Sequence, residues 1–407
     1  MKFLHSADWQ IGARFRQFGD QAARLSEARL RTLRKALQEA ETRGAEAFLI
    51  AGDLFEDNQV APAVVTSVFD LFTEFDKCPI LILPGNHDPF TGPASIWGRR
   101  PFAGAPAHIK VFTSPEARPL GEGWIVANPL LQKRSTFDPS RKLVELAAAL
   151  PAEASKIGMT HGSPMIESQH QADDHPIALE AATRAGLDYL ALGHWHDELR
   201  LDGGRMVMSG SPEPTDFSER GTGAVLEVEI ERHGALPKIT PLQLAEWRWA
   251  HHVFDLADTA RAMAEVEAAG AEFARDEARS VVWRATLCGN VRPGAVEEFR
   301  RRLSEIASER LLLDVRDETI SELTDAEIAG LCREHPLIAQ VMEDLASLSA
   351  RASGELGTGE EGAGISPTEF EALCARIGRA PHEMTPAFIA KARRLLTIEL
   401  REASETC

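Results

Sequence analysis

The chain has 407 residues, a length that predicts two or three domains. Its net charge of −18 argues against a protein that coats nucleic acid electrostatically, but it does not exclude a nuclease. No apolar run approaches the roughly 18 residues of a membrane span, and the first residues lack a signal-peptide pattern, so we expect a cytoplasmic protein without membrane contacts. The five cysteines form no CxxC pair, which argues against a zinc ribbon or a disulfide framework.

Polar motifs recur through the first half of the chain, each shortly after an apolar run. The runs cover residues 2–4, 47–51, 80–83, 156–159 and 189–192, and each has the composition of a buried strand. Because ligands collect outside the carboxyl ends of parallel strands, we expect the motifs to converge on one crevice of an α/β sheet. In chain order the motifs are Asp8-Trp9-Gln10, Gly52-Asp53, Gly85-Asn86-His87-Asp88, Thr160-His161-Gly162 and Gly193-His194-Trp195-His196.

Amphipathic helices are predicted between these strands, and two more strands follow. The alternation predicts an α/β domain over residues 1–240, in which helices cover the sheet. The predicted helices cover residues 22–43, 64–75 and 177–185, and the added strands cover 206–208 and 224–230.

The remaining residues predict a smaller unit and a tail. Strands and helices alternate as βαβαβ over 245–325, which predicts a small α+β domain. A helical segment is expected over 326–351, and the glycine-rich and glutamate-rich stretch 352–365 predicts a flexible linker. Two helices are predicted in the tail over 366–407, and their apolar stripe indicates that they dock on something.

The motif residues form a mixed set of metal ligands. Asp53 closes a Gly-Asp step after a strand and has the position of a carboxylate that bridges two divalent cations. Imidazole and amide groups beside few carboxylates favour Mn²⁺, Fe²⁺ or Zn²⁺ over Mg²⁺, and a metal pair suits phosphoester hydrolysis. The expected ligand groups on the two sides of Asp53 are Asp8, Gln10 and His196, and Asn86, His161 and His194.

Other polar residues near the motifs receive different interpretations. His87 directly follows the ligand Asn86, so we predict a catalytic role, in which it stabilises the transferring phosphoryl group or protonates the leaving oxygen. Asp88 is expected to orient His87, and His5 is interpreted as a core histidine or a supporting residue behind the ligands. A polar run that looks ligand-like is interpreted as solvated surface; its residues are His170, Asp173, Asp174 and His175.

Taken together, the motifs resemble those of the calcineurin-like metallophosphoesterases. Within that superfamily, His5-Ser6-Ala7-Asp8-Trp9, Ala51-Gly52-Asp53-Leu54-Phe55 and Ser209-Gly210-Ser211-Pro212 resemble the SbcD-type and YhaO-type nuclease subunits of DNA repair. The motifs cover residues 1–230, and they are more specific for the superfamily than for its nuclease branch. The resemblance implies a β-sandwich flanked by helices.

The resemblance also implies a function and partners. The expected protein is a dimetal-dependent DNA exo- and endonuclease that acts on DNA ends in repair or defence, with Mn²⁺ as the first choice of metal. The βαβαβ unit resembles the family's capping domain, and the tail helices resemble its segment that binds the coiled coil of an SMC-like ATPase. A homodimer through the nuclease domain is a further expectation.

One departure from the family concerns the first motif, which usually reads Asp-x-His and here contains Gln10. A glutamine oxygen binds these metals more weakly than imidazole, so we expect a looser first metal site or a shifted metal preference. Loss of activity is the remaining alternative.

Two other functions stay open. A phosphatase or cyclic-nucleotide phosphodiesterase for small substrates would need neither the extra domain nor the tail. A weakly active DNA-end-binding scaffold is supported only by Gln10. Exposed basic residues near the crevice are candidate DNA contacts, with ordinary surface charge as the alternative; they are Arg14, Arg16, Arg99, Arg100, Lys133 and Arg134.

Overall fold

The structure is a computed structural model, and its described part divides into two compact units. The first unit comprises Met1–His251, Arg275–Arg284 and Glu309–Asp314, and the second comprises the described residues of His252–Ala274, Ala285–Ser308 and Val315–Cys407. The structure describes residues 1–167, 171–219, 223–275, 279–291, 294–306, 310–321, 325–334, 336, 339–345, 385, 388, 389, 392 and 396.

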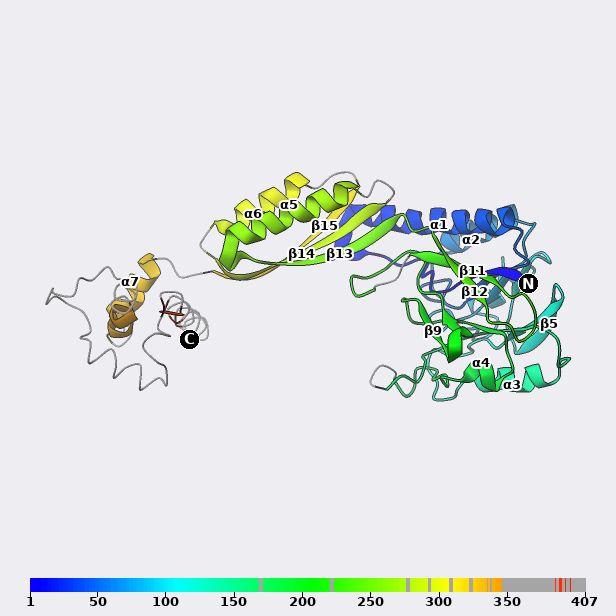
Figure 1. Cartoon of the computed structure of the whole chain (residues 1–407). Helices are drawn as coiled ribbons and strands as arrows, with labels where there is room; N and C mark the ends of the chain where they lie inside the picture. The colour runs from blue at the N-terminus through cyan, green and yellow to red at the C-terminus, as the bar shows by residue number, and fades with distance from the viewer. Residues whose placement is uncertain are drawn as a thin grey trace. The chain divides into compact units, whose positions relative to one another are not determined.

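The first unit contains two six-stranded sheets (Figure 1). In the first sheet the order is β12-β11-β1-β2-β3-β4, with β1 to β4 parallel and β11 antiparallel to both of its neighbours. The strands are β1 (Lys2–Ser6), β2 (Phe48–Ala51), β3 (Ile80–Leu83), β4 (Ile109–Val111), β11 (Ala224–Glu229) and β12 (Lys238–Gln243).

The second sheet has the order β5-β6-β7-β8-β10-β9. Its four central strands are parallel, and the edge strands β5 and β9 are antiparallel to their neighbours. The strands are β5 (Glu116–Leu120), β6 (Gly123–Ala127), β7 (Lys156–His161), β8 (Tyr189–Gly193), β9 (Leu199–Leu201) and β10 (Met206–Met208).

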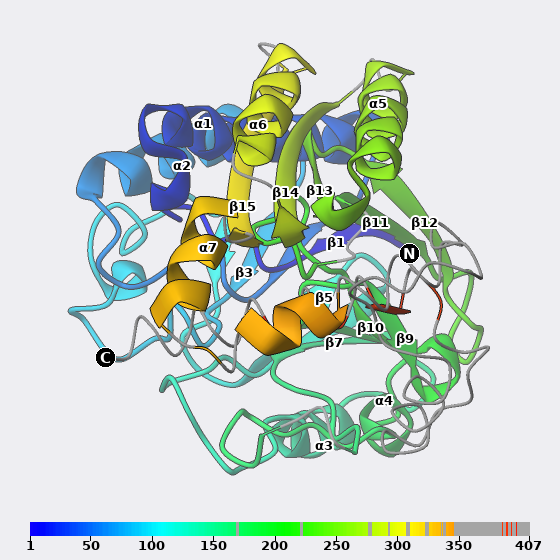
Figure 2. The same ribbon diagram turned by 90° about the vertical axis from the view of Figure 1, so that its left-hand side faces the viewer.

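Helices cover the outer face of each sheet, so the first unit is a four-layer sandwich (Figures 1 and 2). Along β2, Phe48 and Ile50 pack with the helices, whereas Leu49 and Ala51 pack between the sheets. Both faces of the strand are buried, which explains its uninterrupted apolar sequence. The helices are α1 (Ala22–Thr42) and α2 (Pro62–Glu74) on the first sheet, and α3 (Ser140–Ala148) and α4 (Ala181–Arg184) on the second. Short 3₁₀ helices are η1 (Arg16–Gln21), η2 (Ile96–Gly98), η3 (Asp202–Gly204) and η4 (Leu256–Asp258).

The two sheets approach each other closely at the carboxyl ends of β2 and β8. A Cβ atom on Gly193 would lie only 2.7 Å from the carbonyl oxygen of Ala51 and 2.4 Å from the Cβ of Ala7. Glycine is therefore required where β8 passes the first sheet. As a result, the loops that follow β1, β2 and β3 meet the loops that follow β7 and β8. The motifs converge as the sequence predicts, but from two facing sheets instead of one.

Most of the predicted elements of this unit are confirmed, and the differences lie between residues 100 and 245. The predicted helix over 177–185 is wrong in extent, because Ile177 instead forms a β-bridge with Pro164 and only Ala181–Arg184 is helical. Six further elements are not predicted from the sequence: the strands β4, β5, β6, β9 and β12 and the helix α3. The predicted α/β class, with sheets flanked by helices, is confirmed.

The elements after β12 alternate as the sequence predicts. They form a three-stranded sheet in the order β13-β14-β15, and Figures 1 and 2 show α5 and α6 side by side on one of its faces. The division between the two units falls within these strands. The elements are β13 (Trp247–Asp255), α5 (Thr259–Arg275), β14 (Ser280–Val291), α6 (Ala295–Ile306), β15 (Leu311–Ser321) and α7 (Asp325–Glu334).

The predicted domain boundaries at 1–240, 245–325 and 326–351 stay predictions. The predicted linker over 352–365 lies outside the described residues, as does the tail over 366–407 apart from single positions. Within the described part of the chain, no helix has both the length and the apolar character needed to cross a membrane.

Candidate metal centre

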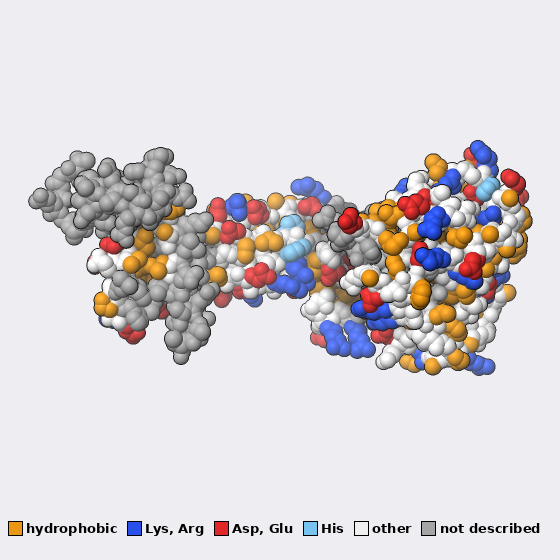
Figure 3. Space-filling view, turned by 90° about the horizontal axis from the view of Figure 1, so that it is seen from below, with side chains coloured by type: hydrophobic (Ala, Val, Ile, Leu, Met, Phe, Trp, Pro, Cys, Tyr) orange, Lys and Arg blue, Asp and Glu red, His pale blue; other side chains and the backbone are white. Residues whose placement is uncertain are grey.

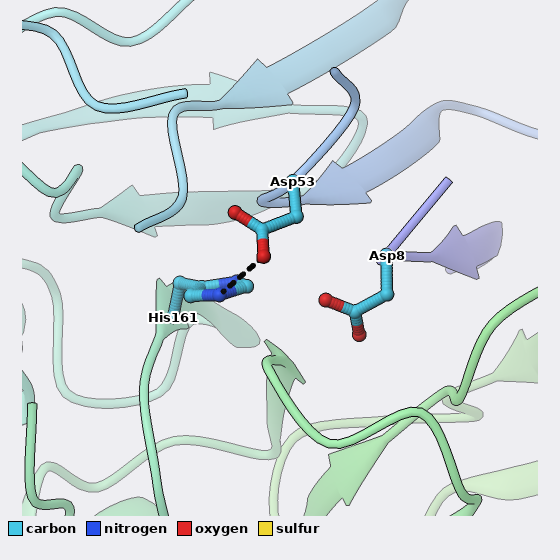
Figure 4. A group of neighbouring side chains, drawn as sticks. All are labelled: Asp8, Asp53 and His161. Carbon is cyan, nitrogen blue, oxygen red and sulfur yellow. Dashed lines mark ion pairs between the residues drawn. The ribbon is translucent and has the colours of Figure 1, made fainter. Parts of the chain in front are cut away.

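Three buried side chains converge where the two sheets meet. Ligand atoms of Asp8, Asp53 and His161 all lie within 4.8 Å of one another. Figure 4 shows the carboxylate of Asp53 and the ring of His161 pointing toward each other, with Asp8 opposite both. Asp8 follows β1, Asp53 follows β2, and His161 ends β7, so each comes from the carboxyl end of a different strand.

The local backbone brings these groups together at a conformational cost. Asp8 and Asp53 have φ angles of 53° and 51°, in the left-handed region that side chains other than glycine rarely adopt. Gly52 has a φ of 102°, and a Cβ atom there would lie 2.0 Å from Nδ1 of His161. The Gly-Asp step is thus needed both for the turn and for the close approach of the imidazole.

Asp53 contacts residues from both of the expected ligand groups. Its Oδ2 lies 3.4 Å from Nε2 of His161 and accepts a 3.3 Å hydrogen bond from Nε2 of Gln10. Its Oδ1 accepts a 2.9 Å hydrogen bond from the backbone N–H of His87. Burial alone would raise the pKa of Asp53, but the nearby imidazole of His161 holds that pKa below its ordinary value. Asp53 is therefore an ionised, central carboxylate, as a bridging ligand must be.

The hydrogen bonds of three histidines fix which ring nitrogen faces the cluster. In each ring one nitrogen contacts a carbonyl or a carboxylate, which can only accept, so that nitrogen carries the proton and the other keeps a lone pair in the neutral ring. A carboxylate or carbonyl behind a metal-binding histidine has this effect in metal sites generally. The contacts are His161 Nδ1 to Ala51 O (2.8 Å), His194 Nε2 to Asp174 Oδ2 (2.7 Å) and His196 Nδ1 to Glu219 Oε1 (2.6 Å).

Asn86 lies between two of these lone pairs. Its Oδ1 is 2.8 Å from Nε2 of His161 and 2.9 Å from Nδ1 of His194. Two ligands that each lie about 2.1 Å from a metal at a right angle are about 3 Å apart. The spacing of Asn86, His161 and His194 beside Asp53 therefore fits a single cation.

The second group, on the other side of Asp53, is less complete. Gln10 is buried, and its Oε1 has no hydrogen-bond partner among the described residues. Both carboxylate oxygens of Asp8 lie 3.0 Å from the backbone N–H of His194. A buried oxygen without a partner is costly, and a cation would satisfy it. Asp8, Gln10 and His196 thus fit a second cation, with a weaker donor set.

Comparison with known proteins agrees with this geometry. Residues 1–198 match the calcineurin-like phosphoesterase family. The chain carries a calcineurin-like phosphoesterase domain. Members of this family bind divalent metals and hydrolyse phosphoesters, and the matched residues include every predicted ligand. No curated protein matches the chain.

The charge balance of the phosphoesterase site favours cations. Burial alone would lower the pKa of His161, but the carboxylates of Asp53 and Asp8 raise it to about 9. Burial likewise opposes the charged form of His196, whereas the hydrogen bond that its Nδ1 donates to the Glu219 carboxylate and the negative charge of Asp8 raise its pKa to about 9. Without a metal the cluster attracts protons, so a divalent cation must displace them when it binds.

His87 lies beside the site without joining the ligand cluster. Its backbone binds Asp53, while its Nδ1 donates a 2.9 Å hydrogen bond to the carbonyl of Glu56. The expectation that Asp88 orients His87 is wrong. The Asp88 carboxylate instead accepts hydrogen bonds from the backbone N–H groups of Gly85 (2.7 Å) and Phe55 (3.0 Å), and so joins the loops after β2 and β3.

His5 is a buried core histidine. Its Nε2 donates to the carbonyl of Leu192 at 3.1 Å, so its Nδ1 accepts from the hydroxyl of Tyr189 at 2.8 Å. Burial lowers the pKa of His5 to about 3, which keeps the ring neutral. These bonds tie β1 to β8 directly behind the site.

The sequence did not predict several residues that lie at the phosphoesterase site. Asp174 contacts His194, and His175 is buried, so the interpretation of this run as solvated surface is wrong for both. His170 lies outside the described residues. Glu219 contacts His196 although it follows it by 23 positions. Arg29 on α1 is buried and donates to the carbonyl of Trp9, which supports the first ligand loop from behind.

Proposed function

We propose that this chain is a dimetal-dependent DNA nuclease that hydrolyses phosphodiester bonds at DNA ends. The observation that carries the proposal is the pair of ligand groups that share Asp53, within a domain of the phosphoesterase family. The sequence resemblance to SbcD-type subunits supports DNA as the substrate. We further propose Mn²⁺ as the working metal, because imidazole and amide donors outnumber carboxylates in the site.

The chain's own residues have separate tasks in this reaction. Bound cations supply Lewis acidity toward the phosphodiester and lower the pKa of water. Asp53 holds the two ligand groups together, and the imidazole of His161 is fixed by its bond to Ala51. His87 has its Nδ1–H bound to Glu56, which leaves Nε2 to contact the phosphoryl group or to move a proton to the leaving oxygen.

The surface beside the site favours a polymeric substrate. Two loops pair there, because the backbone N–H of Ser135 donates to the carbonyl of Asp173 at 2.9 Å and Ser135 forms a β-bridge with Asp174. These loops expose large apolar side chains: Leu131 is 52% exposed, Phe137 78% and Met165 39%. Aromatic and apolar groups beside basic ones suit the bases and phosphates of a frayed DNA end.

The basic residues on one face of the first unit do not form a continuous band. On the face of the first unit seen in Figure 3, Lys and Arg side chains occur in separate groups between acidic and uncharged surface. Arg134, one of the candidate DNA contacts, forms a 3.0 Å ion pair with Asp173. With a net charge of −18, the chain needs a partner for strong DNA binding.

Replacing Phe137 by alanine should weaken the enzyme's action on DNA without changing its hydrolysis of small esters. Stacking of a base on an aromatic ring contributes about 1–3 kcal/mol, so we expect the KM for DNA with frayed ends to rise at least fivefold or so. Hydrolysis of bis-p-nitrophenyl phosphate should not change, because Phe137 is none of the predicted ligands and its side chain is exposed. Leu236→Ala, at another exposed apolar position of the first unit, is the control. An equal loss on both substrates would assign Phe137 a structural role.

One assay tests the proposed function against its alternatives. Mn²⁺-dependent degradation of duplex DNA ends is measured beside hydrolysis of p-nitrophenyl phosphate monoesters and diesters. We expect DNA cleavage that disappears in Asp53→Asn, which excludes a contaminating nuclease. Hydrolysis of the esters alone would favour a small-substrate phosphoesterase. DNA-end binding without hydrolysis of any substrate would favour a scaffold subunit.

We also propose that the tail helices bind an SMC-like ATPase and that the nuclease domain forms a homodimer. Deleting residues 353–407 should leave ester hydrolysis nearly unchanged, since every predicted ligand precedes residue 200. It should abolish co-purification with the ATPase and any ATP-stimulated cleavage. Phe388→Glu with Leu395→Glu should have the same effect, because the added charges would lose water at the interface. Full-stoichiometry co-purification of the truncated chain would contradict the proposed role of the tail.

A further inference from the structure

The loop that follows β7 returns to the metal centre and is held in place on both sides. The backbone N–H of Ile177 donates to the carbonyl of Ser163 at 2.8 Å, so the start and the end of the loop are joined. The backbone N–H of His175 donates to the carbonyl of Ser135 at 2.9 Å, which fixes the loop to its neighbour. These bonds flank Asp174 and give its side chain a defined position.

Asp174 uses that position to hold one of the site histidines. Its Oδ2 lies 2.7 Å from Nε2 of His194, and its side chain is only 29% exposed. Among the described residues, Asp174 is the partner of Nε2, the ring nitrogen of His194 that faces away from the other ligand candidates. The second ring nitrogen, Nδ1, faces Oδ1 of Asn86 at 2.9 Å. The carboxylate therefore fixes both the tautomer and the rotation of this ring.

The position of the His194 ring depends on its contact with Asp174 more strongly than the position of the His161 ring depends on its contact with Ala51. His161 is fully buried and bonded to a strand carbonyl, whereas His194 is partly exposed and stands on a backbone with a φ of 121°. The two rings meet edge to face with their centroids 5.3 Å apart. Rotation of His194 about its side-chain bonds would carry Nδ1 away from Asn86 and open the ligand group.

We infer that Asp174 is a positioning residue of the metal centre: it orients His194 so that the group formed with Asn86 and His161 binds its cation tightly. The inference concerns metal binding by the phosphoesterase site and holds whichever phosphoester is the substrate. Partners of this kind, behind a metal ligand, contribute about 10-fold to 100-fold in metal affinity. Asp174 would therefore determine the affinity of one of the two metal sites for its cation.

The test is a calorimetric titration of the metal-free full chain with Mn²⁺ alone. We expect Asp174→Ala to weaken one of the two binding steps by about 10-fold to 100-fold and to leave the other within about threefold. Asp174→Asn keeps an oxygen acceptor for Nε2 and removes the charge, so its affinity should lie closer to that of the parent chain than to that of Asp174→Ala. With Co²⁺ as a second probe, the visible spectrum of Asp174→Ala should change, because His194 would leave its ligand position.

The adjacent residue provides a matched control. Asp173 has the same charge and forms its ion pair with Arg134 at the surface, so Asp173→Ala should titrate like the parent chain. Thermal unfolding of each metal-free variant shows whether the loop still folds. Unchanged Mn²⁺ affinity in Asp174→Ala would overturn the inference. So would an equal loss in Asp173→Ala, or an Asp174→Asn variant as weak as Asp174→Ala, since either result would assign the effect to charge alone. Because no DNA is used, failure of the nuclease proposal would leave this result intact.

Discussion

Replacing His87 by alanine should lower phosphodiester hydrolysis by about 100-fold to 10,000-fold while the protein still binds its metals. The reason lies in how His87 is attached to the site. Its backbone N–H, which alanine retains, donates to Asp53, whereas within the described part of the chain its imidazole is hydrogen-bonded to the carbonyl of Glu56. The substitution therefore removes a group that can contact the phosphoryl oxygen without removing the hydrogen bond to the carboxylate of Asp53.

The measurement combines metal content by mass spectrometry with the rate of ester hydrolysis. Added imidazole should restore part of the lost activity if a proton transfer is involved. His108→Ala is the matched control, because His108 is also half-buried and its Nε2 also bonds a backbone carbonyl, that of Phe72 at 3.1 Å. Loss of metal together with activity in His87→Ala would place His87 among the ligands and contradict the assignment.

The ligand candidates were predictable because each follows an apolar strand. The sequence around Asp53, an uninterrupted apolar run ending in Gly-Asp, indicates a strand buried on both faces and a turn that a Cβ atom at Gly52 would block. The same reasoning locates Asn86 and His161. What the sequence shows is the chemical type of each group and its place at a strand end. That is enough to group the ligands but not to give their distances.

The supporting residues were not predictable in the same way. Glu219 and Asp174 are carboxylates in polar loops, and nothing local distinguishes them from solvated surface. Their roles arise from tertiary contacts with His196 and His194. The restraint on His161 is a backbone carbonyl, which has no sequence signature at all. The missed strands have a related cause, since β4 has only three residues and β5 contains two charged residues and a proline among its five.

Gln10→His should tighten cation binding by the group formed by Asp8, Gln10 and His196, which contains the departure from the family pattern. In the structure the Gln10 amide directs an N–H at Oδ2 of Asp53, while its oxygen has no hydrogen-bond partner among the residues that the structure describes. That N–H competes with a cation for the same carboxylate oxygen. The amide group must also rotate before its own oxygen can bind the cation. A histidine places Nε2 the same number of bonds from Cβ and offers a lone pair without this competition. Imidazole is also the stronger donor for Mn²⁺, Fe²⁺ and Zn²⁺.

The expected result is a drop of about tenfold in the Mn²⁺ concentration for half-maximal activity, which corresponds to about 1.4 kcal/mol of binding free energy. Calorimetry should assign the change to the weaker of the two binding steps. Gln10→Leu, which keeps the bulk and removes the amide, should weaken that step, and Gln17→His provides a control in which a histidine is added at an exposed position of η1. If neither Gln10 variant alters the titration, the Gln10 side chain makes no contribution to cation binding beside Asp8 and His196, and its unpartnered oxygen must be satisfied by water. If Gln10→His tightens binding and Gln10→Leu weakens it, the chain binds its two cations with unequal affinity because of this one residue.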